Sequence, residues 1–215
     1  MKDTFKPVSN TQGLFVPSTL VDIIIRDRGA QAYTDYAEFQ ITDPDVIVSA
    51  ARQTLESIPP SFGSCVMVSA GFTAILKSQG IPAVVVLGDL LINGQYAFEC
   101  RGNIPGATYE GEFVDAKWDG HAWVMLAGVL CDLSIFRSAY ATKTPSNLKT
   151  FISQQFGEGK GALMCPHDSL PVGMEFVPKF ALNDDQILGI LDGLSRQHLR
   201  LSDEIRGGIP GCVGS

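Results

Sequence analysis

The sequence contains no segment that would cross a lipid bilayer as a helix. Its longest apolar stretch, residues 81–92, is interrupted by Pro82, Gly88 and Asp89. A membrane-spanning helix needs roughly 20 consecutive apolar residues, so this stretch is too short. Residues 1–7 also lack the apolar core of a signal peptide. We therefore expect a cytoplasmic protein with no membrane partner.

Basic residues are few and scattered. The chain has 16 lysines and arginines against 23 aspartates and glutamates, which gives a formal net charge of −7. It contains no run of five or more basic residues. Nucleic acids and anionic membrane surfaces both attract clustered positive charge. The charge balance therefore argues against either of them as a partner.

The cysteines lack the spacing of a metal site or a disulfide framework. They are far apart, odd in number and without a Cys-x-x-Cys pair: Cys65, Cys100, Cys131, Cys165 and Cys212. This pattern predicts free thiols in a reducing compartment and gives no support to a zinc ribbon or a thioredoxin-like site. A metal site built from Cys65, Cys165 and His167 is the weakest of the alternatives. We expect no cofactor.

The remaining composition is that of a globular protein. Of the 215 residues, 45% are apolar and 18% are charged, which excludes disorder over most of the chain. The length predicts one domain, residues 1–215. A chain of this size buries roughly 70–75% of its unfolded surface, so it needs no metal or disulfide for stability.

Helix and strand signals follow one another in an order typical of an α+β fold. Caps, stops and apolar spacing predict helices at residues 18–28, 44–58, 65–79, 146–156 and 183–199. Short apolar segments separated by turns predict strands at residues 81–87, 96–100, 112–118, 121–126 and 129–134. Because the strands are consecutive, we expect an antiparallel sheet. The helix at 65–79 is apolar on nearly every face, which predicts a buried, central position.

Cys65 is the most informative residue for function. Ser64 is a good N-cap, so Cys65 is expected at the first position of the central helix. Unpaired backbone N–H groups and the positive end of the helix dipole favour a thiolate there. The thiolate is the nucleophilic form of cysteine. The competing interpretation is a small core residue, which is the role of most isolated cysteines.

A second informative segment, residues 121–134, has the pattern of a hairpin that turns at Ala127-Gly128. With a two-residue loop, His121 and Asp132 are diagonal neighbours on one face of the hairpin, within side-chain reach of each other. A three-residue loop would put them on opposite faces. The acid would then be one of two other residues, Asp115 or Asp119. The competing interpretation is an edge histidine with an unrelated aspartate.

Cys65, His121 and Asp132 together supply a nucleophile, a base and an orienting acid. The backbone N–H of Cys65 is expected to be one donor to an oxyanion. The turn that ends at Ser64 leaves room for a substrate backbone, and Trp118 and Trp123 flank His121 and could line a cleft. Tryptophan in a sheet is at least as often plain core.

Several of these segments resemble the transglutaminase-like branch of the papain-like cysteine enzymes. They span about residues 45–135 and comprise Ser64-Cys65, residues 80–88 (Gly-Ile-Pro-Ala-Val-Val-Val-Leu-Gly), residues 121–124 (His-Ala-Trp-Val) and Asp132. The resemblance implies a papain-like fold, in which a helical lobe with a buried nucleophile helix packs on an antiparallel sheet. It also implies a Cys65, His121 and Asp132 triad, with family-specific extensions at 1–44 and 136–215.

We therefore expect a cysteine-dependent acyl-transfer enzyme, a thiol peptidase or amidase that acts on a peptide or small amide. The alternative is a non-catalytic binding or scaffold domain that retains the fold. The absence of an evident oxyanion helper favours this alternative, as does Val66 where transglutaminases have tryptophan. A third interpretation, an arylamine acetyltransferase-like enzyme, would need a basic site for an acyl-coenzyme, and the acidic chain offers none.

Overall fold

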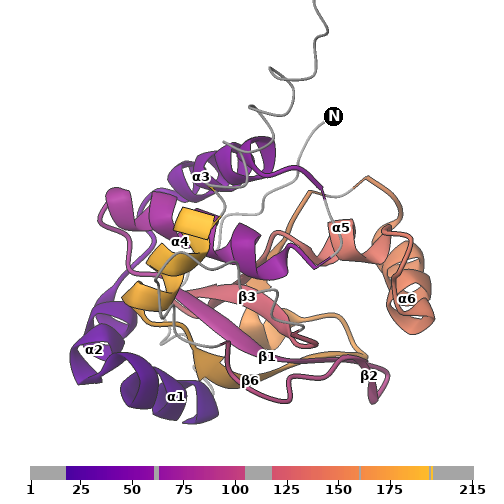
Figure 1. Cartoon of the computed structure of the whole chain (residues 1–215), viewed down its shortest axis with the longest axis horizontal. Coiled ribbons are helices and arrows are strands. Elements are labelled where there is room, and N and C mark those ends of the chain that lie inside the picture. The colour runs from indigo at the N-terminus through magenta and orange to yellow at the C-terminus, as the bar shows by residue number, and fades with distance from the viewer. Residues whose placement is uncertain (1–17, 61–62, 105–117, 160, 194, 196–215) are drawn as a thin grey trace, which may run out of the picture.

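The structure is a computed structural model that describes residues 18–60, 63–104, 118–159, 161–193 and 195 (Figure 1). Its helices are α1 (Ser18–Arg28), α2 (Ala30–Glu38), α3 (Pro44–Ser57), α4 (Cys65–Ser78), α5 (Ile135–Ala139) and α6 (Ser146–Phe156). Its strands are β1 (Val84–Ile92), β2 (Gln95–Phe98), β3 (His121–Leu126), β4 (Val129–Asp132), β5 (Leu163–Pro166) and β6 (Met174–Ala181). Residues 184–193 form a further helix.

The predicted α+β class and antiparallel sheet are confirmed. All of the strand pairs in the described residues are antiparallel. The bounds of α1, α6 and β3 are those predicted, and α3 and α4 end within one residue of their predicted ends. The predicted strand at 112–118 lies outside the described residues except for Trp118. No helix of the described residues is long and apolar enough to cross a membrane.

The starts of α3 and α4 differ in how they are capped. Asp43 has extended backbone, and its side chain accepts a hydrogen bond from Asp45 N at 3.0 Å, as expected for an N-cap before Pro44. Ser64 occupies the N-cap position of α4, but its side chain makes no capping hydrogen bond. Its φ and ψ of −78° and 4° are not the extended values that side-chain capping requires. Its carbonyl instead accepts from Val68 N at 2.9 Å.

Strand β1 organises the sheet because three strands pair along its two edges. One edge pairs with β6 from Val86 to Ile92. The other edge is shared: β3 pairs with the first half, up to Gly88, and β2 pairs with the second half, from Leu90. We call this division of the edge, at Asp89, the fork. The chain leaves the sheet after β2 and returns to it at the start of β3, so both ends lie at the fork.

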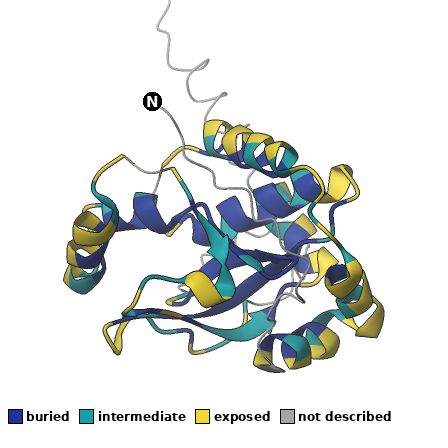
Figure 2. Ribbon diagram, turned by 180° about the vertical axis from the view of Figure 1, so that it is seen from behind, coloured by how far each residue is buried: buried dark blue, intermediate teal, exposed yellow. Residues whose placement is uncertain are grey.

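Helices cover both faces of the sheet, and each face has its own apolar core. The first core joins α1, α2, α5 and α6 to alternate residues of β1 and β3, such as Val86 and Trp123. The second joins α3 and α4 to the intervening residues, such as Val85 and Val124. Strands β1 and β3 are therefore largely buried, whereas the outer sides of the helices are exposed (Figure 2). This two-sided burial explains why most positions of β1 and β3 are apolar instead of alternating, with Asp89 and His121 as the polar exceptions.

Two α-helices and two strands do not follow from the sequence signals: α2, α5, β5 and β6. Strand β6 lies in the segment that the resemblance treats as an extension, residues 136–215, yet it pairs along most of β1. It contains Pro178, which cannot donate to a ladder and therefore weakens the strand signal. The fold tolerates this proline because β6 pairs only with β1 in the described residues and has a bulge there.

Candidate active site

The hairpin of β3 and β4 turns as the sequence predicts. Val124 pairs with Cys131 and Leu126 with Val129, which leaves a two-residue loop at Ala127 and Gly128. Both loop residues have positive φ, 46° and 76°, as expected for a type I′ turn that matches the twist of the strands. The two-residue register is therefore confirmed. It brings His121 Nε2 within 2.5 Å of Asp132 Oδ2.

The Asp132 carboxylate is held firmly by its second oxygen. Oδ1 accepts hydrogen bonds from Ser134 N at 2.9 Å, Ser134 Oγ at 2.8 Å and Ile135 N at 2.9 Å. These bonds cap the start of α5 and end β4 at Asp132 instead of at the predicted Ser134. The carboxylate is fully buried, so it orients His121 from a fixed position. Of the alternative acids, Asp115 lies outside the described residues, and Asp119 is exposed.

The His121 imidazole is fully buried and lies among aromatic rings. Phe98 stacks on it at 5.1 Å between centroids, with the planes 13° apart, and Trp123 and Phe176 lie at 6.4 and 6.0 Å. Burial alone would lower the His121 pKa. The charge and hydrogen bond of Asp132, with a smaller contribution from Cys65, raise this pKa to about 10. The imidazolium is therefore the stable form at neutral pH.

Cys65 interacts with the histidine that Asp132 orients. It is the first residue of α4 and is buried beside His121, whose pKa it raises through a side-chain hydrogen bond and its charge. Nε2 is occupied by Asp132, whereas Nδ1 is buried and has no partner with standard hydrogen-bond geometry among the described residues. The structure thus brings together the three residues predicted as a triad. Nδ1 is the ring atom left to exchange a proton with the thiol.

A small pocket opens beside Cys65 and His121. Its volume is about 130 Å³, and its other lining residues are Gly63, Phe98, Trp118, Asp119, Gly120 and Ser138. Ligand pockets for drug-sized molecules measure roughly 300–1,000 Å³, so this one fits an acyl group or the tip of a side chain. The described lining residues include no lysine or arginine.

The three residues predicted to bind substrate have different environments. Trp118 is half-buried and lines the pocket, and its Nε1 donates to Gly102 O at 2.9 Å. Trp123 is only 1% exposed and packs in the first core. It lies two residues after His121, on the face of β3 that the first core covers. Ser64 is buried before Cys65 and is not among the described residues that line the pocket.

Sequence reasoning missed three lining residues, Phe98, Gly120 and Ser138. The sequence did offer one signal for Gly120, which is that this glycine lies directly before His121. A Cβ there would lie 2.4 Å from the Trp118 ring, so only glycine lets the indole cross the backbone at this point. Phe98 and Ser138 reach the pocket through the pairing of β2 and the capping of α5. Neither contact has a local signature in the sequence.

The other described cysteines differ from Cys65 in their surroundings. All four described cysteines are free, as their spacing predicts, and Cys212 lies outside the described residues. Burial raises the pKa of Cys131 to about 12 and that of Cys165 to about 11, and it also raises the pKa of Cys100. No group of three potential metal ligands occurs in the described part of the chain, so a site of Cys65, Cys165 and His167 has no support there.

No protein-family model, curated protein or solved structure matches the chain.

Proposed function

We propose that the protein is a cysteine-dependent acyl-transfer enzyme, a thiol peptidase or amidase with a transglutaminase-like, papain-like fold. Cys65 is the nucleophile, His121 the acid and base, and Asp132 the residue that orients His121. One observation carries the proposal: the buried His121 ring uses Nε2 for Asp132 and keeps Nδ1 without a regular partner, beside a cysteine that begins a helix. A buried ring nitrogen is costly unless it is paired, so Nδ1 depends on the neighbouring Cys65 side chain.

The geometry supports a thiolate–imidazolium pair as the resting state. The raised His121 pKa keeps the ring protonated at neutral pH, and its positive charge favours a neighbouring thiolate. Among the described residues, the first backbone hydrogen bond of α4 runs from Val68 N to Ser64 O. The N–H groups at the start of a helix favour a thiolate or an oxyanion beside them.

The reaction then proceeds in two balanced steps. The Cys65 thiolate forms a bond to the substrate carbonyl carbon, and the His121 imidazolium gives its proton to the leaving nitrogen as the C–N bond breaks. This step leaves an acyl-thioester on Cys65 and a neutral imidazole. Water or an amine next attacks the thioester and gives its proton to His121. The C–S bond breaks, and the thiolate–imidazolium pair is restored.

The pocket argues against the acetyltransferase-like alternative. An acyl-coenzyme carries several phosphates, which basic side chains commonly bind. The described lining has no lysine or arginine, and besides Cys65 and His121 its one ionisable side chain is Asp119. A peptide carbonyl or a small amide fits the small volume and the aromatic walls better.

The test is site-resolved alkylation by iodoacetamide as a function of pH, with Cys100, Cys131 and Cys165 as internal controls. We expect Cys65 to be labelled at least about tenfold faster than the others near neutral pH, because their thiols stay protonated. His121→Ala should remove this advantage. Equal labelling of Cys65 in the native chain and in His121→Ala would contradict the proposal and favour the non-catalytic scaffold.

A further inference from the structure

An ion pair lies at the fork, directly beside the candidate site. Asp89 is the β1 residue between Gly88, which pairs with His121, and Leu90, which pairs with Phe98. It is buried in the sheet, where a carboxylate is costly unless it is paired. Lys179 Nζ of β6 lies 2.8 Å from Asp89 Oδ1. The pair therefore stands between the two strand ends that frame the pocket.

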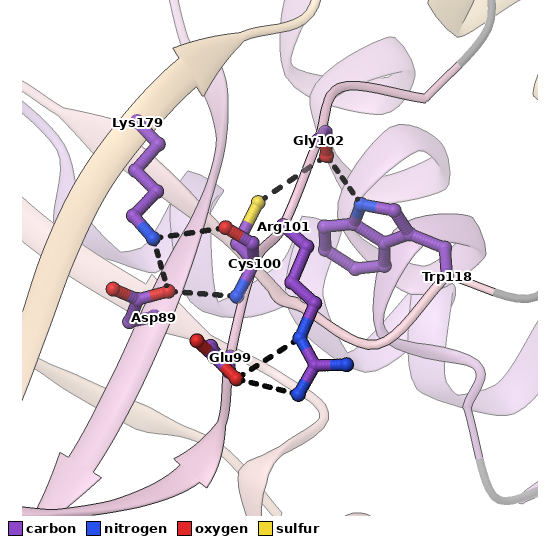
Figure 3. A network of polar contacts seen from close by, with 7 residues as sticks. All are labelled: Asp89, Glu99, Cys100, Arg101, Gly102, Trp118 and Lys179. Carbon is purple, nitrogen blue, oxygen red and sulfur yellow. Dashed lines mark hydrogen bonds and ion pairs between the residues drawn. The ribbon is translucent and has the colours of Figure 1, made fainter.

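The pair binds both backbone polar groups of Cys100, the residue at which the chain leaves the sheet after β2 (Figure 3). Cys100 N donates to Asp89 Oδ1 at 2.7 Å, and Lys179 Nζ donates to Cys100 O at 2.8 Å. One carboxylate oxygen and one ammonium group thus fix the N–H and the carbonyl of a single residue. A charge-assisted hydrogen bond is roughly twice as strong as a neutral one.

Cys100 connects to both aromatic walls of the pocket. It follows Phe98 by two residues, and Phe98 stacks on His121. Beyond it, Gly102 O accepts the hydrogen bond of Trp118 Nε1, as Figure 3 shows. A Cβ added at Gly120 would lie 2.8 Å from Cys100 Cβ, so Cys100 also touches the backbone that leads into His121.

Two β-bulges aim these side chains. In the pairing of β1 with β6, Leu87 faces Phe180 and Gly88 faces Pro178, so Lys179 is the extra residue between them. In the pairing of β1 with β2, Leu90 faces Phe98 and Leu91 faces Tyr96, so Ala97 is the extra residue. Bulges redirect neighbouring side chains and are common beside active sites. Here one bulge lies at Lys179 and the other lies directly beside Phe98.

We propose that the Asp89–Lys179 ion pair is a positioning device for the active site. By fixing the Cys100 peptide groups, it keeps the Phe98 ring on the His121 imidazole and the Trp118 ring in the pocket wall. Neither Asp89 nor Lys179 lines the pocket, so both act through other residues. The inference rests on the proposed function, because it assumes that His121 acts on Cys65.

The experiment compares Lys179→Met with Asp89→Ala. The two variants change the local charge in opposite directions, but each releases one side of the Cys100 peptide. Positioning therefore predicts the same effect from both: Cys65 alkylation near neutral pH slows by about tenfold, and its pH profile moves upward. Lys179 is 35% exposed in its side chain, so Lys179→Met is expected to fold, and Lys179→Arg should restore most of the rate.

A second measurement follows the pocket wall directly. Trp123 is 1% exposed, so quenching of tryptophan fluorescence by acrylamide reports mainly on Trp118. We expect stronger quenching in both variants. Arg28→Met is the matched control, because it breaks a partly buried ion pair with Asp184 at 2.8 Å that joins other elements. It should lower the free energy of unfolding but leave the labelling profile and the quenching unchanged.

The outcomes separate this inference from the proposed function. If the two variants move the pH profile in opposite directions, the pair acts by its charges alone and the positioning role is wrong. If both behave like Arg28→Met while His121→Ala labels slowly, only this inference fails. If His121→Ala labels like the native chain, the proposed function fails and the inference fails with it.

Discussion

The ring of Phe98 and the imidazole of His121 lie nearly parallel across the fork of the sheet, with centroids 5.1 Å apart and planes 13° apart. The two residues come from β2 and β3, which both pair with β1 on the same edge. An aromatic face beside a cation is favourable, so this contact supports the charged form of the imidazole as well as its orientation. It also makes Phe98 a wall of the pocket.

Removing this wall should change which reagents reach Cys65. In Phe98→Ala we expect the rate of alkylation by a bulky aryl iodoacetamide, relative to iodoacetamide, to rise by about tenfold, because the pocket is small. Phe176→Ala is the control, since Phe176 also contacts His121 but is absent from the described lining. An unchanged ratio in Phe98→Ala would mean that this ring does not limit access.

The two described histidines should titrate on opposite sides of the ordinary value of 6.5. The pKa of His121 is raised to about 10, so this ring keeps its proton as the pH rises through neutrality. Burial lowers the pKa of His167 below the ordinary value, so this ring is already neutral at neutral pH. Nitrogen-15 NMR of the imidazoles near pH 8 should show protonated His121 and neutral His167. A neutral His121 at that pH would contradict the ion-pair description.

Asp132→Asn should reverse the direction of the His121 shift. The substitution keeps the shape of the side chain but removes the charge that offsets burial, and burial alone lowers the pKa of a histidine. We expect the pKa of His121 to fall below about 6.5, so that the ring is neutral at neutral pH. Alkylation of Cys65 near neutral pH should slow in parallel. Asp185→Asn, an exposed aspartate remote in sequence, is a suitable control that should change neither measurement.

Gly120→Ala should disturb the pocket wall without touching the triad. The new Cβ would lie 2.4 Å from one atom of the Trp118 ring and 2.8 Å from Cys100 Cβ, so the indole has to move. We expect a loss of about 1–3 kcal/mol in the free energy of unfolding, together with a change in tryptophan emission. Gly193→Ala has nothing within 4 Å and should be tolerated. Urea unfolding followed by fluorescence measures both variants.

Tyr36→Phe tests what holds the turn of the triad hairpin. Gly128 N donates to Tyr36 Oη at 3.0 Å, and both residues are buried. Removing the hydroxyl leaves a buried N–H without its partner, which costs about 1–3 kcal/mol. Tyr33→Phe on the same helix is the control and should change the urea midpoint much less. Equal losses in the two variants would assign the effect to α2 in general instead of to the turn.

The missed extent of β1 shows where sequence signals mislead. Gly88 and Asp89 are typical of a turn, and the sequence predicts that the strand ends before them, yet β1 continues to Ile92. Gly88 is needed because a Cβ would lie 2.0 Å from Val177 O, and Asp89 is accepted because Cys100 N and Lys179 satisfy its carboxylate. Val177 and Lys179 lie in β6, far away along the chain, and Cys100 lies after the next strand, β2. Local propensity cannot contain these contacts.

By itself, the sequence determined the features that depend on neighbouring residues. Apolar spacing after Ser64 predicted that α4 begins at Cys65, although the Ser64 side chain does not cap the helix. The turn at Ala127 and Gly128 set the register that joins His121 to Asp132. Only the tertiary structure decided that α4 and β3 begin side by side, that β6 supplies Lys179, and that Phe98 covers His121. These contacts join segments distant in sequence. They form because burying both faces of one sheet stabilises the whole chain. This stabilisation depends on contacts throughout the fold, so no local pattern of residues predicts it.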